Sequence, residues 1–221
     1  MTLKQRYAQS IELLNQMFPN ADTELMHGDT FQLLIAVILS AQCTDKRVNE
    51  VTPALFEKFP DCQAMAQATP EEVFPYIKSV SYPNSKSKYL VNCSKRLSEV
   101  YHGVVPSSVE ELQTLQGVGR KTANVIAAIV FHQAKMPVDT HVHRVSRRIG
   151  LTNNAKTVRQ TEDQLMKNLD EKDIALLHHQ LILLGRYICQ ARKPKCNECK
   201  LTSVCKNFIS LQNQTAKHNK T

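Results

Sequence analysis

Residues 115–125 read LQGVGRKTANV, and this stretch decides the fold that the sequence predicts. Gly117 and Gly119 precede a predicted helix, so backbone N–H groups at its start can approach a phosphate, which the helix dipole also attracts. A Gly-x-Gly alone is weak evidence, because any tight turn between two helices could use it. Here a leucine precedes the turn, an Arg-Lys pair follows it, and a small alanine allows close helix packing. The stretch therefore predicts a helix–hairpin–helix, a motif that holds the DNA backbone without reading base sequence.

Outward from this hairpin, apolar residues recur at helical spacing, and no segment alternates convincingly as a strand would. Capping boxes at Thr69 with Glu72 and at Ser107 with Glu110 mark the starts of two further helices. Longer helices are predicted over residues 3–17, 31–42, 84–102, 121–131, 140–149, 155–169 and 173–188. The sequence therefore predicts an all-α fold.

The composition limits the class of protein. The chain has 221 residues, enough for one large domain or two small domains. It carries 28 Lys and Arg against 20 Asp and Glu, a formal net charge of +8, which favours a polyanionic partner because each neutralised phosphate releases counterions. No apolar run reaches the ~18 residues of a membrane span, and the first residues lack the apolar core of a secretory signal. We therefore expect a cytoplasmic, nucleoid-associated protein that does not enter a membrane.

Four of the seven cysteines fall in one stretch with the spacing C-x6-C-x2-C-x5-C: Cys189, Cys196, Cys199 and Cys205. Without an export signal, metal ligation explains them better than disulfides. Two centres take four thiolates, a tetrahedral zinc ion and a 4Fe–4S cube. Zinc sites usually pair two short knuckles, and here only Cys196 and Cys199 form one, so the wide first gap favours the cube. The other three cysteines are predicted to pack in the core: Cys43, Cys62 and Cys93.

Three basic residues lie between the first two cysteines of this stretch: Arg192, Lys193 and Lys195. A solvated basic loop is the simpler interpretation. If a metal centre ties the loop down, however, its cations lose less entropy on docking and become suitable contacts for phosphates. We predict the second arrangement.

Lys121 begins the second helix of the predicted hairpin. A phosphate-contacting lysine is one interpretation, and a nucleophilic amine is the other. A nucleophile must be neutral, and the positive end of a helix together with Arg120 disfavours the protonated form. Lys121 is therefore a candidate catalytic residue.

Asp139 precedes the predicted helix over residues 140–149 and would serve as its N-cap. A carboxylate among basic residues could also stabilise a cationic transition state, or take a proton from an attacking amine. Asp139 is therefore a second candidate catalytic residue. His141 is better explained as structural or phosphate-directed than as a metal ligand.

Together, LQGVGRKTANV, VDTHVHRV at residues 138–145 and the four-cysteine loop resemble the endonuclease III family, and the resemblance runs from about residue 10 to 208. It implies two helical lobes with DNA in the cleft between them. One lobe is a six-helix barrel at 22–132 with its helix–hairpin–helix at about 108–131. The other joins 1–21 to 133–208 and holds the 4Fe–4S cluster, and 209–221 forms a flexible tail.

The resemblance also implies an activity, a bifunctional DNA N-glycosylase and AP lyase acting on oxidised pyrimidines in duplex DNA. The damaged base flips out of the duplex, and the Lys121 amine attacks the sugar C1′. The base departs, a Schiff base forms, and β-elimination breaks the strand 3′ to the lesion. Asp139 assists the attack and stabilises positive charge at the sugar. Such an enzyme is expected to act as a monomer.

The motifs and the resemblance together predict these DNA contacts: Gln42, Tyr82, Gly117, Gly119, Arg120, His141, Arg144, Arg192, Lys193 and Lys195. Gln42 matches the family residue that fills the hole left by the flipped base. The chain departs from the family at Gln116, where the family usually has Pro. It departs again at Ser81-Tyr82-Pro83, where the family often has Gly-Leu-Tyr, so Tyr82 replaces a leucine wedge and leaves the opposite-base preference open.

Three other functions compete with this one. The related adenine glycosylases generally lack the hairpin lysine and carry an extra C-terminal domain, so Lys121 and an end at residue 221 argue against that class. An iron–sulfur electron carrier would give the hairpin and Asp139 no role. A non-catalytic DNA-binding protein would not need both Lys121 and Asp139.

Overall fold

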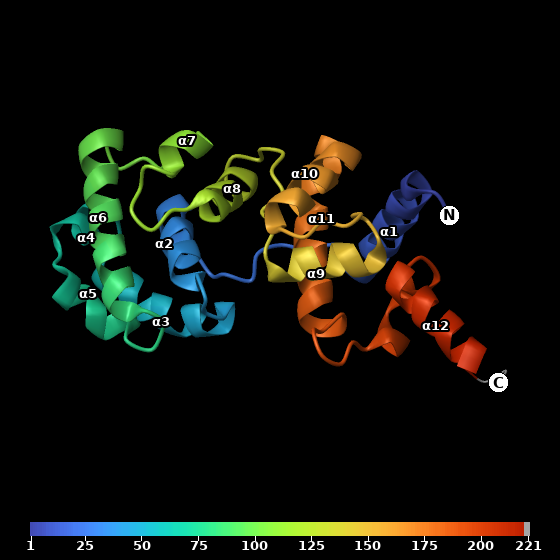
Figure 1. The fold of residues 1–221 in the computed structure, drawn as a ribbon. Helices are drawn as coiled ribbons and strands as arrows, with labels where there is room; N and C mark the ends of the chain where they lie inside the picture. Colours follow the sequence, from blue (N-terminus) through green and yellow to red (C-terminus); the bar gives the residue numbers. More distant parts are fainter. Residues whose placement is uncertain (219–221) are drawn as a thin grey trace. The chain divides into compact units, whose positions relative to one another are not determined.

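The computed structural model describes residues 1–218, with side chains described for 1–215, and within that part every regular element is helical (Figure 1). The α-helices are α1 (Leu3–Met17), α2 (Thr30–Ser40), α3 (Asp45–Lys58), α4 (Cys62–Gln67), α5 (Pro70–Ile77), α6 (Pro83–Tyr101), α7 (Val109–Leu112), α8 (Arg120–Ile129), α9 (Thr140–Ile149), α10 (Val158–Asn168), α11 (Glu171–Leu183) and α12 (Lys206–His218). A π-helical turn η1 (Leu184–Ile188) continues α11, and two 3-10 turns follow, η2 (Cys196–Glu198) and η3 (Lys200–Ser203). The predicted all-α fold is confirmed. Among the described helices, none is long and apolar enough to cross a membrane.

The chain divides into two compact units. One unit is a continuous stretch of the sequence, Glu24–Gln133, and holds α2 to α8. The other combines Met1–Thr23 with the chain from Ala134 onward, and so joins α1 to α9–α12. We call them the central unit and the terminal unit.

The central unit is built around α2. Every residue from Phe31 to Leu39 except Gln32 is buried, because α3, α6 and α8 all pack against this helix. A helix that is apolar on all sides requires such a position. Asp29 starts it, since its Oδ1 accepts a hydrogen bond from Gln32 N at 2.8 Å. The long helix α6 covers α4 and α5 in the same unit.

One predicted cap is confirmed and the other lies one residue away. Thr69 and Glu72 form the reciprocal capping box at the start of α5. At α7, however, the N-cap is Ser108, whose hydroxyl oxygen accepts from Glu111 N, and not Ser107. Ser107 instead offers its carbonyl oxygen to the Gln133 side chain at 2.7 Å. Two adjacent serines before two adjacent glutamates fit either register, and the tertiary contact decides between them.

The terminal unit depends on α1 returning to the second half of the chain. Tyr7 is buried, and its hydroxyl donates to the Leu151 carbonyl oxygen at 2.8 Å. Arg6 donates to the carbonyl oxygens of Ile149 and Val204. Helix α1 thereby supplies hydrogen-bond donors to carbonyl oxygens at the ends of α9 and η3, which lie about 140 to 200 residues further along the chain.

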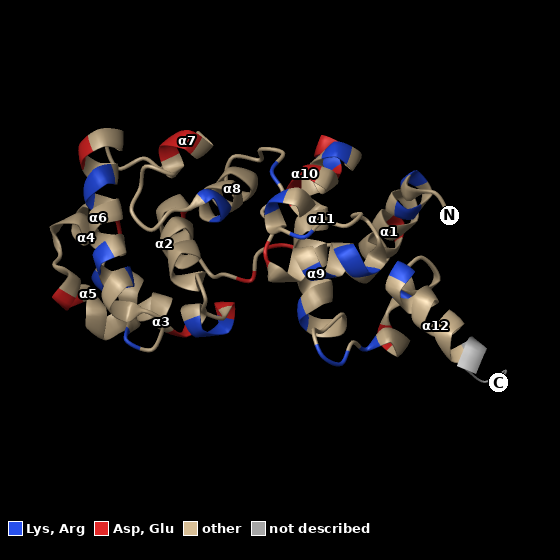
Figure 2. Cartoon of the chain, in the orientation of Figure 1, with Lys and Arg blue, Asp and Glu red and all other residues tan. Residues whose placement is uncertain are grey.

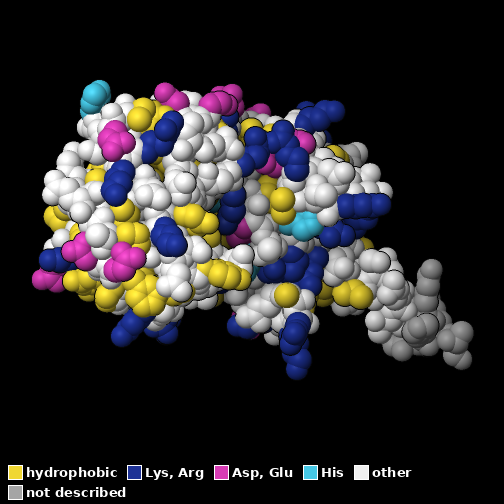
Figure 3. Space-filling model, turned by 60° about the vertical axis from the view of Figure 1, so that its left-hand side comes forward, with side chains coloured by type: hydrophobic (Ala, Val, Ile, Leu, Met, Phe, Trp, Pro, Cys, Tyr) yellow, Lys and Arg dark blue, Asp and Glu magenta, His cyan; other side chains and the backbone are white. Residues whose placement is uncertain are grey.

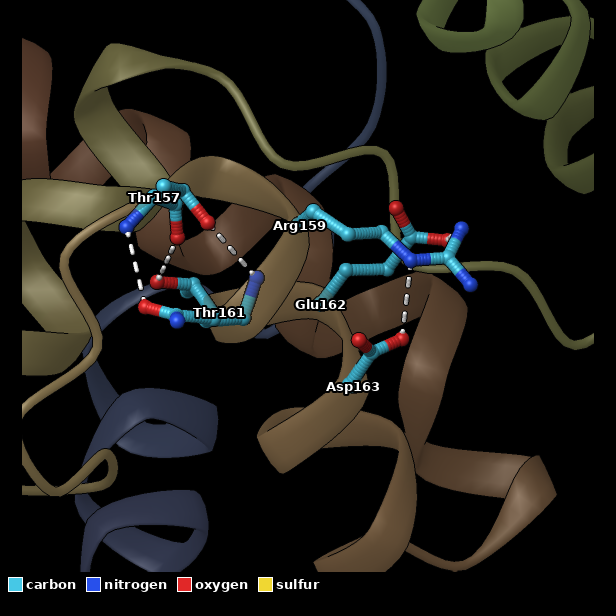
Figure 4. A network of polar contacts seen from close by, with 6 residues as sticks. Thr157, Arg159, Thr161, Glu162 and Asp163 are labelled. Atoms are coloured by element: carbon cyan, nitrogen blue, oxygen red, sulfur yellow. Dashed lines mark hydrogen bonds and ion pairs between the residues drawn. The ribbon is translucent and has the colours of Figure 1, made fainter.

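Helix α10 is fixed by its first turn (Figure 4). Thr157 forms a capping box with Gln160, and the Thr161 hydroxyl donates back to the Thr157 carbonyl oxygen at 3.2 Å. Thr161 Oγ1 also lies 2.7 Å from Nδ1 of His143 on α9. Burial and the nearby Arg147 lower the pKa of His143, which suits a neutral ring used to join the two helices.

The C-terminal region differs from its prediction. A flexible tail was expected from residue 209, but α12 runs from Lys206 to His218, and Gly150 packs against its first residue. Residues 206–218 contain neither Gly nor Pro, and several of them, Leu, Gln, Lys and Ala, favour a helix. The helix that packs against α9 therefore continues through a polar sequence. The structure thus assigns residues 209–218 of the predicted tail to α12, and the rest of the tail lies outside the described residues.

The Tyr7 contact predicts a stability difference. Tyr7→Phe keeps the ring but leaves the Leu151 carbonyl oxygen without this donor in a buried place, so we expect the free energy of unfolding to fall by about 1–3 kcal/mol in urea titrations. Tyr101→Phe is the matched control, because the Tyr101 hydroxyl contacts Thr114 Oγ1 at an exposed position. Equal losses in the two variants would contradict this role for Tyr7.

Candidate functional site

The hairpin turn between α7 and α8 is fixed by a glycine that touches two other helices. Val118 N donates to the Leu115 carbonyl oxygen at 3.2 Å, and Gly117 between them has φ +80°. These are the features of a type II turn, whose third residue favours glycine. A Cβ at Gly117 would lie 2.9 Å from the Tyr89 Cβ and 3.2 Å from the Ile38 Cγ2. Gln116 takes the second position, where proline is common, so the turn forms without the family's proline.

Gly119 has a different reason to be glycine. It is the N-cap of α8 with ordinary extended dihedrals, and among the described residues nothing lies within 4 Å of where its Cβ would stand. A glycine has no side chain with which to cap the first N–H groups of α8. Open space, helix-end N–H groups and the positive end of the helix dipole together make a place where an anion can approach closely.

Lys121 is exposed in the first turn of α8, directly after Gly119 and Arg120. It is the second residue of the helix and so lies next to the open end of α8. The hairpin holds it at a fixed place, because α8 buries Ala123, Ile126 and neighbouring residues against the central unit.

Asp139 is the N-cap of α9 in the terminal unit. Its Oδ1 accepts from Val142 N at 2.8 Å, and the side chain is half-buried. The cap uses one carboxylate oxygen and fixes the side chain, and in the described part of the chain no hydrogen bond uses the other oxygen. Both sequence interpretations of Asp139 are thus compatible, since a cap holds the carboxylate in place without consuming it.

Two arginines of α9 hold the start of the cysteine loop. Arg144 donates to the carbonyl oxygens of Cys189 and Gly185, and its remaining contacts are to Thr140 and His141 of the same helix. These bonds give Arg144 a packing role within the terminal unit, and its predicted DNA contact stays a prediction. His141, also a predicted DNA contact, is half-buried against Gly185.

Arg148, one turn further along α9, donates to the carbonyl oxygens of Gln190 and Ala191 at 2.7 and 2.8 Å. It also lies 3.5 Å from the Cys189 sulfur, and the Cys205 thiol donates to its carbonyl oxygen at 3.4 Å. Sequence reasoning missed this residue, because an arginine in the run SRR is indistinguishable from a solvated one.

The four cysteines of the predicted metal centre are all half-buried in the terminal unit. Burial, together with the neighbouring thiols, raises the pKa of Cys199 and of Cys205, so the four groups lie near enough to interact electrostatically. Across the described residues, no three His, Cys, Asp or Glu side chains converge on one ion-sized position. The four thiols are thus gathered in one part of the terminal unit. Arg192 and Lys193 are exposed on the loop, and Lys195 lies 3.8 Å from Glu198.

Gln42 and Tyr82, the predicted wedge residues, are both exposed and both left-handed, each with φ 55°. Sequence reasoning did not find the residue beneath them, Lys86, which is only 4% exposed. Its ammonium donates to the carbonyl oxygens of Leu39 and Ala41, each at 2.7 Å. Lys86 lies in NSKSK at the start of α6, where the sequence gives no signal that one lysine faces inward.

The basic charge is not shared evenly between the units. The central unit carries 10 Lys and Arg against 11 Asp and Glu, whereas the remainder of the chain carries 18 against 9. The net charges are therefore −1 and +9. Figure 2 shows blue along the loop that follows α11, and red at α5 and α7, and Figure 3 shows groups of dark blue side chains on the face it presents. The terminal unit supplies the attraction for a polyanion.

The chain is similar to known proteins along most of its length. Residues 35–171 match the family model of the HhH-GPD superfamily base excision DNA repair proteins. The chain is 42% identical to endonuclease III of Bacillus subtilis over 196 residues, which cover 89% of this chain and 90% of that protein. It is 39% identical to endonuclease III of Escherichia coli K12 over 201 residues, 90% of this chain and 95% of the relative. The chain belongs to the endonuclease III family. It is accordingly a base excision repair DNA glycosylase and AP lyase.

Solved structures of the family match the fold closely. A structure titled as a trapped endonuclease III–DNA covalent intermediate, an estranged-adenine complex, has a TM-score of 0.90 and 39% identity, covering 96% of this chain and 100% of the other. A thermostable thymine-DNA glycosylase has a TM-score of 0.83 at 19% identity over 93% of this chain and 98% of its own, which demonstrates a shared fold. The predicted family resemblance is confirmed.

Alanine substitutions at the two hairpin glycines are predicted to affect different properties, stability at Gly117 and DNA affinity at Gly119. Gly117→Ala forces a positive φ on alanine and a contact under 3.0 Å with the Tyr89 Cβ, so we expect a loss of about 2 kcal/mol or more in unfolding free energy. Gly119→Ala has space and ordinary dihedrals, so stability should fall by no more than about 1 kcal/mol, the cost of a poorer N-cap, while affinity for duplex DNA falls. Urea unfolding and fluorescence anisotropy measure the two quantities. A stable Gly117→Ala protein, or unchanged DNA affinity in Gly119→Ala, would contradict these assignments.

Proposed function

We propose that this protein removes oxidised pyrimidines from duplex DNA and then cuts the strand 3′ to the abasic site through a Schiff base on Lys121. The observation that carries the proposal is the exposed amine of Lys121 in the first turn of α8, beside the open end of the hairpin helix. The similarity to a trapped covalent endonuclease III–DNA intermediate supports a covalent step. The lesion class rests on the family resemblance in the hairpin, the Asp139 segment and the cysteine loop.

The proposed chemistry needs a neutral amine and a departing base. The Lys121 nitrogen forms a bond to the sugar C1′, and the bond from C1′ to the base breaks, with the base leaving as an anion that takes up a proton. Loss of the amine proton and opening of the sugar give the iminium. Removal of a proton from C2′ then breaks the C3′–oxygen bond, which cuts the strand. Water finally releases Lys121 from the product.

Asp139 is proposed to assist the first of these steps. Its Oδ1 is held by Val142 N, so the carboxylate has a fixed direction, and an anion placed near C1′ stabilises the positive charge that develops there. It can also accept the proton that the attacking amine gives up. The later elimination depends less on Asp139, because the base has already gone.

DNA binding is proposed to combine both units. The hairpin holds the backbone through Gly117, Gly119 and Arg120, and the terminal unit supplies most of the positive charge, with Arg192, Lys193 and Lys195 exposed on one loop. Gln42 and Tyr82 are proposed to enter the duplex around the flipped nucleotide. The lobe boundaries at residues 22 and 132, a cleft that holds the DNA, the monomeric state and a nucleoid-associated location stay predictions.

The four-cysteine loop is proposed to hold a 4Fe–4S cluster. The donor set fits, because four half-buried cysteine thiols, the usual ligands of such a cluster, lie together in one loop. When bound, the cluster joins the four thiolates and so restrains the loop that carries the basic residues. Arg144 and Arg148 hold the same loop to α9 through its backbone carbonyl oxygens.

Two substitutions separate the proposed catalytic roles. Borohydride should trap the wild-type enzyme on an abasic duplex, and Lys121→Gln should abolish both trapping and strand cleavage, because it removes the amine. Asp139→Asn keeps a good N-cap and should slow base removal by about 10²–10⁴-fold while slowing cleavage of a ready-made abasic site less. Trapping of Lys121→Gln at the wild-type rate would assign the chemistry to another amine.

The cluster predicts a defined metal content. Purified protein should be brown and contain about four irons per chain by elemental analysis. Cys196→Ala should lower the iron content and the thermal stability of the protein, whereas Cys93→Ala, which changes a buried cysteine of the other unit, should keep the iron. Colourless, folded protein with one zinc per chain would support the zinc alternative instead.

A further inference from the structure

The turns that carry Gln42 and Tyr82 are both held away from ordinary backbone geometry. Each residue has φ 55°, in a region that side chains other than glycine rarely adopt. Tyr82 also precedes Pro83, the first residue of α6, and a residue before proline is restricted to extended conformations. Such geometry persists only where surrounding contacts impose it, and it concentrates at functional sites.

The contacts that impose it come from Ser81 and Lys86. The Ser81 hydroxyl donates to the Gln42 carbonyl oxygen at 2.7 Å, and so joins the residue before Tyr82 to the other turn. The Lys86 ammonium lies 3.3 Å from the Ser81 oxygen and bonds the carbonyl oxygens of Leu39 and Ala41. All three ammonium hydrogens therefore have an acceptor, as a buried lysine requires.

The ammonium lies where α2 ends. The last carbonyl groups of a helix lack partners within it, and the helix dipole places partial negative charge there. Lys86, which belongs to α6, satisfies these groups and brings the start of α6 to the end of α2. Burial lowers the pKa of Lys86, and the nearby Cys43 opposes that change.

We infer that Ser81 and Lys86 are positioning residues that join the Gln42 and Tyr82 turns into one preformed wedge for the DNA duplex. The inference rests on the proposed entry of Gln42 and Tyr82 into DNA. It assigns a purpose to the Ser81 hydroxyl, which bonds the Gln42 carbonyl oxygen. It also accounts for an aromatic side chain left 62% exposed, since Tyr82 offers a flat face on which the base opposite the lesion can stack. A wedge ordered before binding loses less entropy on insertion.

The inference predicts a defect that is limited to duplex substrates. Ser81→Ala should lower kcat/KM about 5- to 10-fold on a lesion in duplex DNA, the scale of one hydrogen bond, and leave cleavage of a single-stranded abasic oligonucleotide unchanged. Ser81→Thr keeps a hydroxyl and should restore the duplex rate, whereas Ser81→Gly should be at least as slow as Ser81→Ala. A general folding defect would lower both rates together.

A double-mutant cycle tests whether Ser81 acts through Gln42. The probe is a duplex with a non-cleavable tetrahydrofuran abasic site opposite 2-aminopurine, whose fluorescence rises when that base is unstacked. Wild type should raise the fluorescence, Gln42→Ala should reduce the rise, and adding Ser81→Ala to Gln42→Ala should have little further effect. Additive effects of the two changes would overturn the positioning role, as would a wild-type rise in Ser81→Ala.

The same probe distinguishes failure of the proposed function. If Gln42→Ala and Tyr82→Ala raise the fluorescence as wild type does, these residues do not enter the duplex, and the wedge itself is wrong. Lys86→Met should reproduce the Ser81→Ala defect in a more severe form. Because this variant removes a buried cation and can fail to fold, the Ser81 series decides the outcome.

Discussion

The contact on which the central unit's site depends is the one that Gly117 makes with α2 and α6. Its Cβ position lies against Ile38 of α2 and Tyr89 of α6, so only a glycine lets the hairpin backbone settle there. The same two helices carry the wedge, because Gln42 follows the end of α2 and Tyr82 precedes α6. The hairpin and the wedge are thus mounted on one packed pair of helices, and Lys86 fixes the pair where both turns begin.

In the terminal unit, α9 is the helix on which the candidate site residues depend. Asp139 caps its first turn, and Arg144 and Arg148 on later turns bond the backbone of the cysteine loop. Gly185 allows the close approach of η1 to this helix, since a Cβ there would meet His141 at 2.9 Å. One short helix therefore holds the candidate carboxylate and the cysteine loop in a fixed relation.

The charge division gives the two units different contributions to binding. A near-neutral central unit that carries the hairpin and wedge gains little from long-range attraction, whereas the terminal unit with net charge +9 attracts DNA at a distance. Attraction of this kind weakens as the salt concentration rises. Most of the long-range attraction therefore comes from the terminal unit.

The sequence by itself determined the all-α fold, the hairpin and the family, because helical periodicity, glycine spacing and cysteine spacing are local features of the chain. It also predicted both ends of α1 and α9, Leu3–Met17 and Thr140–Ile149, but it made no prediction for α3 or α4. It failed where a local pattern is degenerate, at the Ser107–Ser108 cap. Only the tertiary structure decided that Lys86 is buried, that Arg144 faces the protein, and that the positive charge gathers in one unit. Burial and pairing of long cationic side chains depend on which distant backbone oxygens meet them, and sequence spacing carries no record of that.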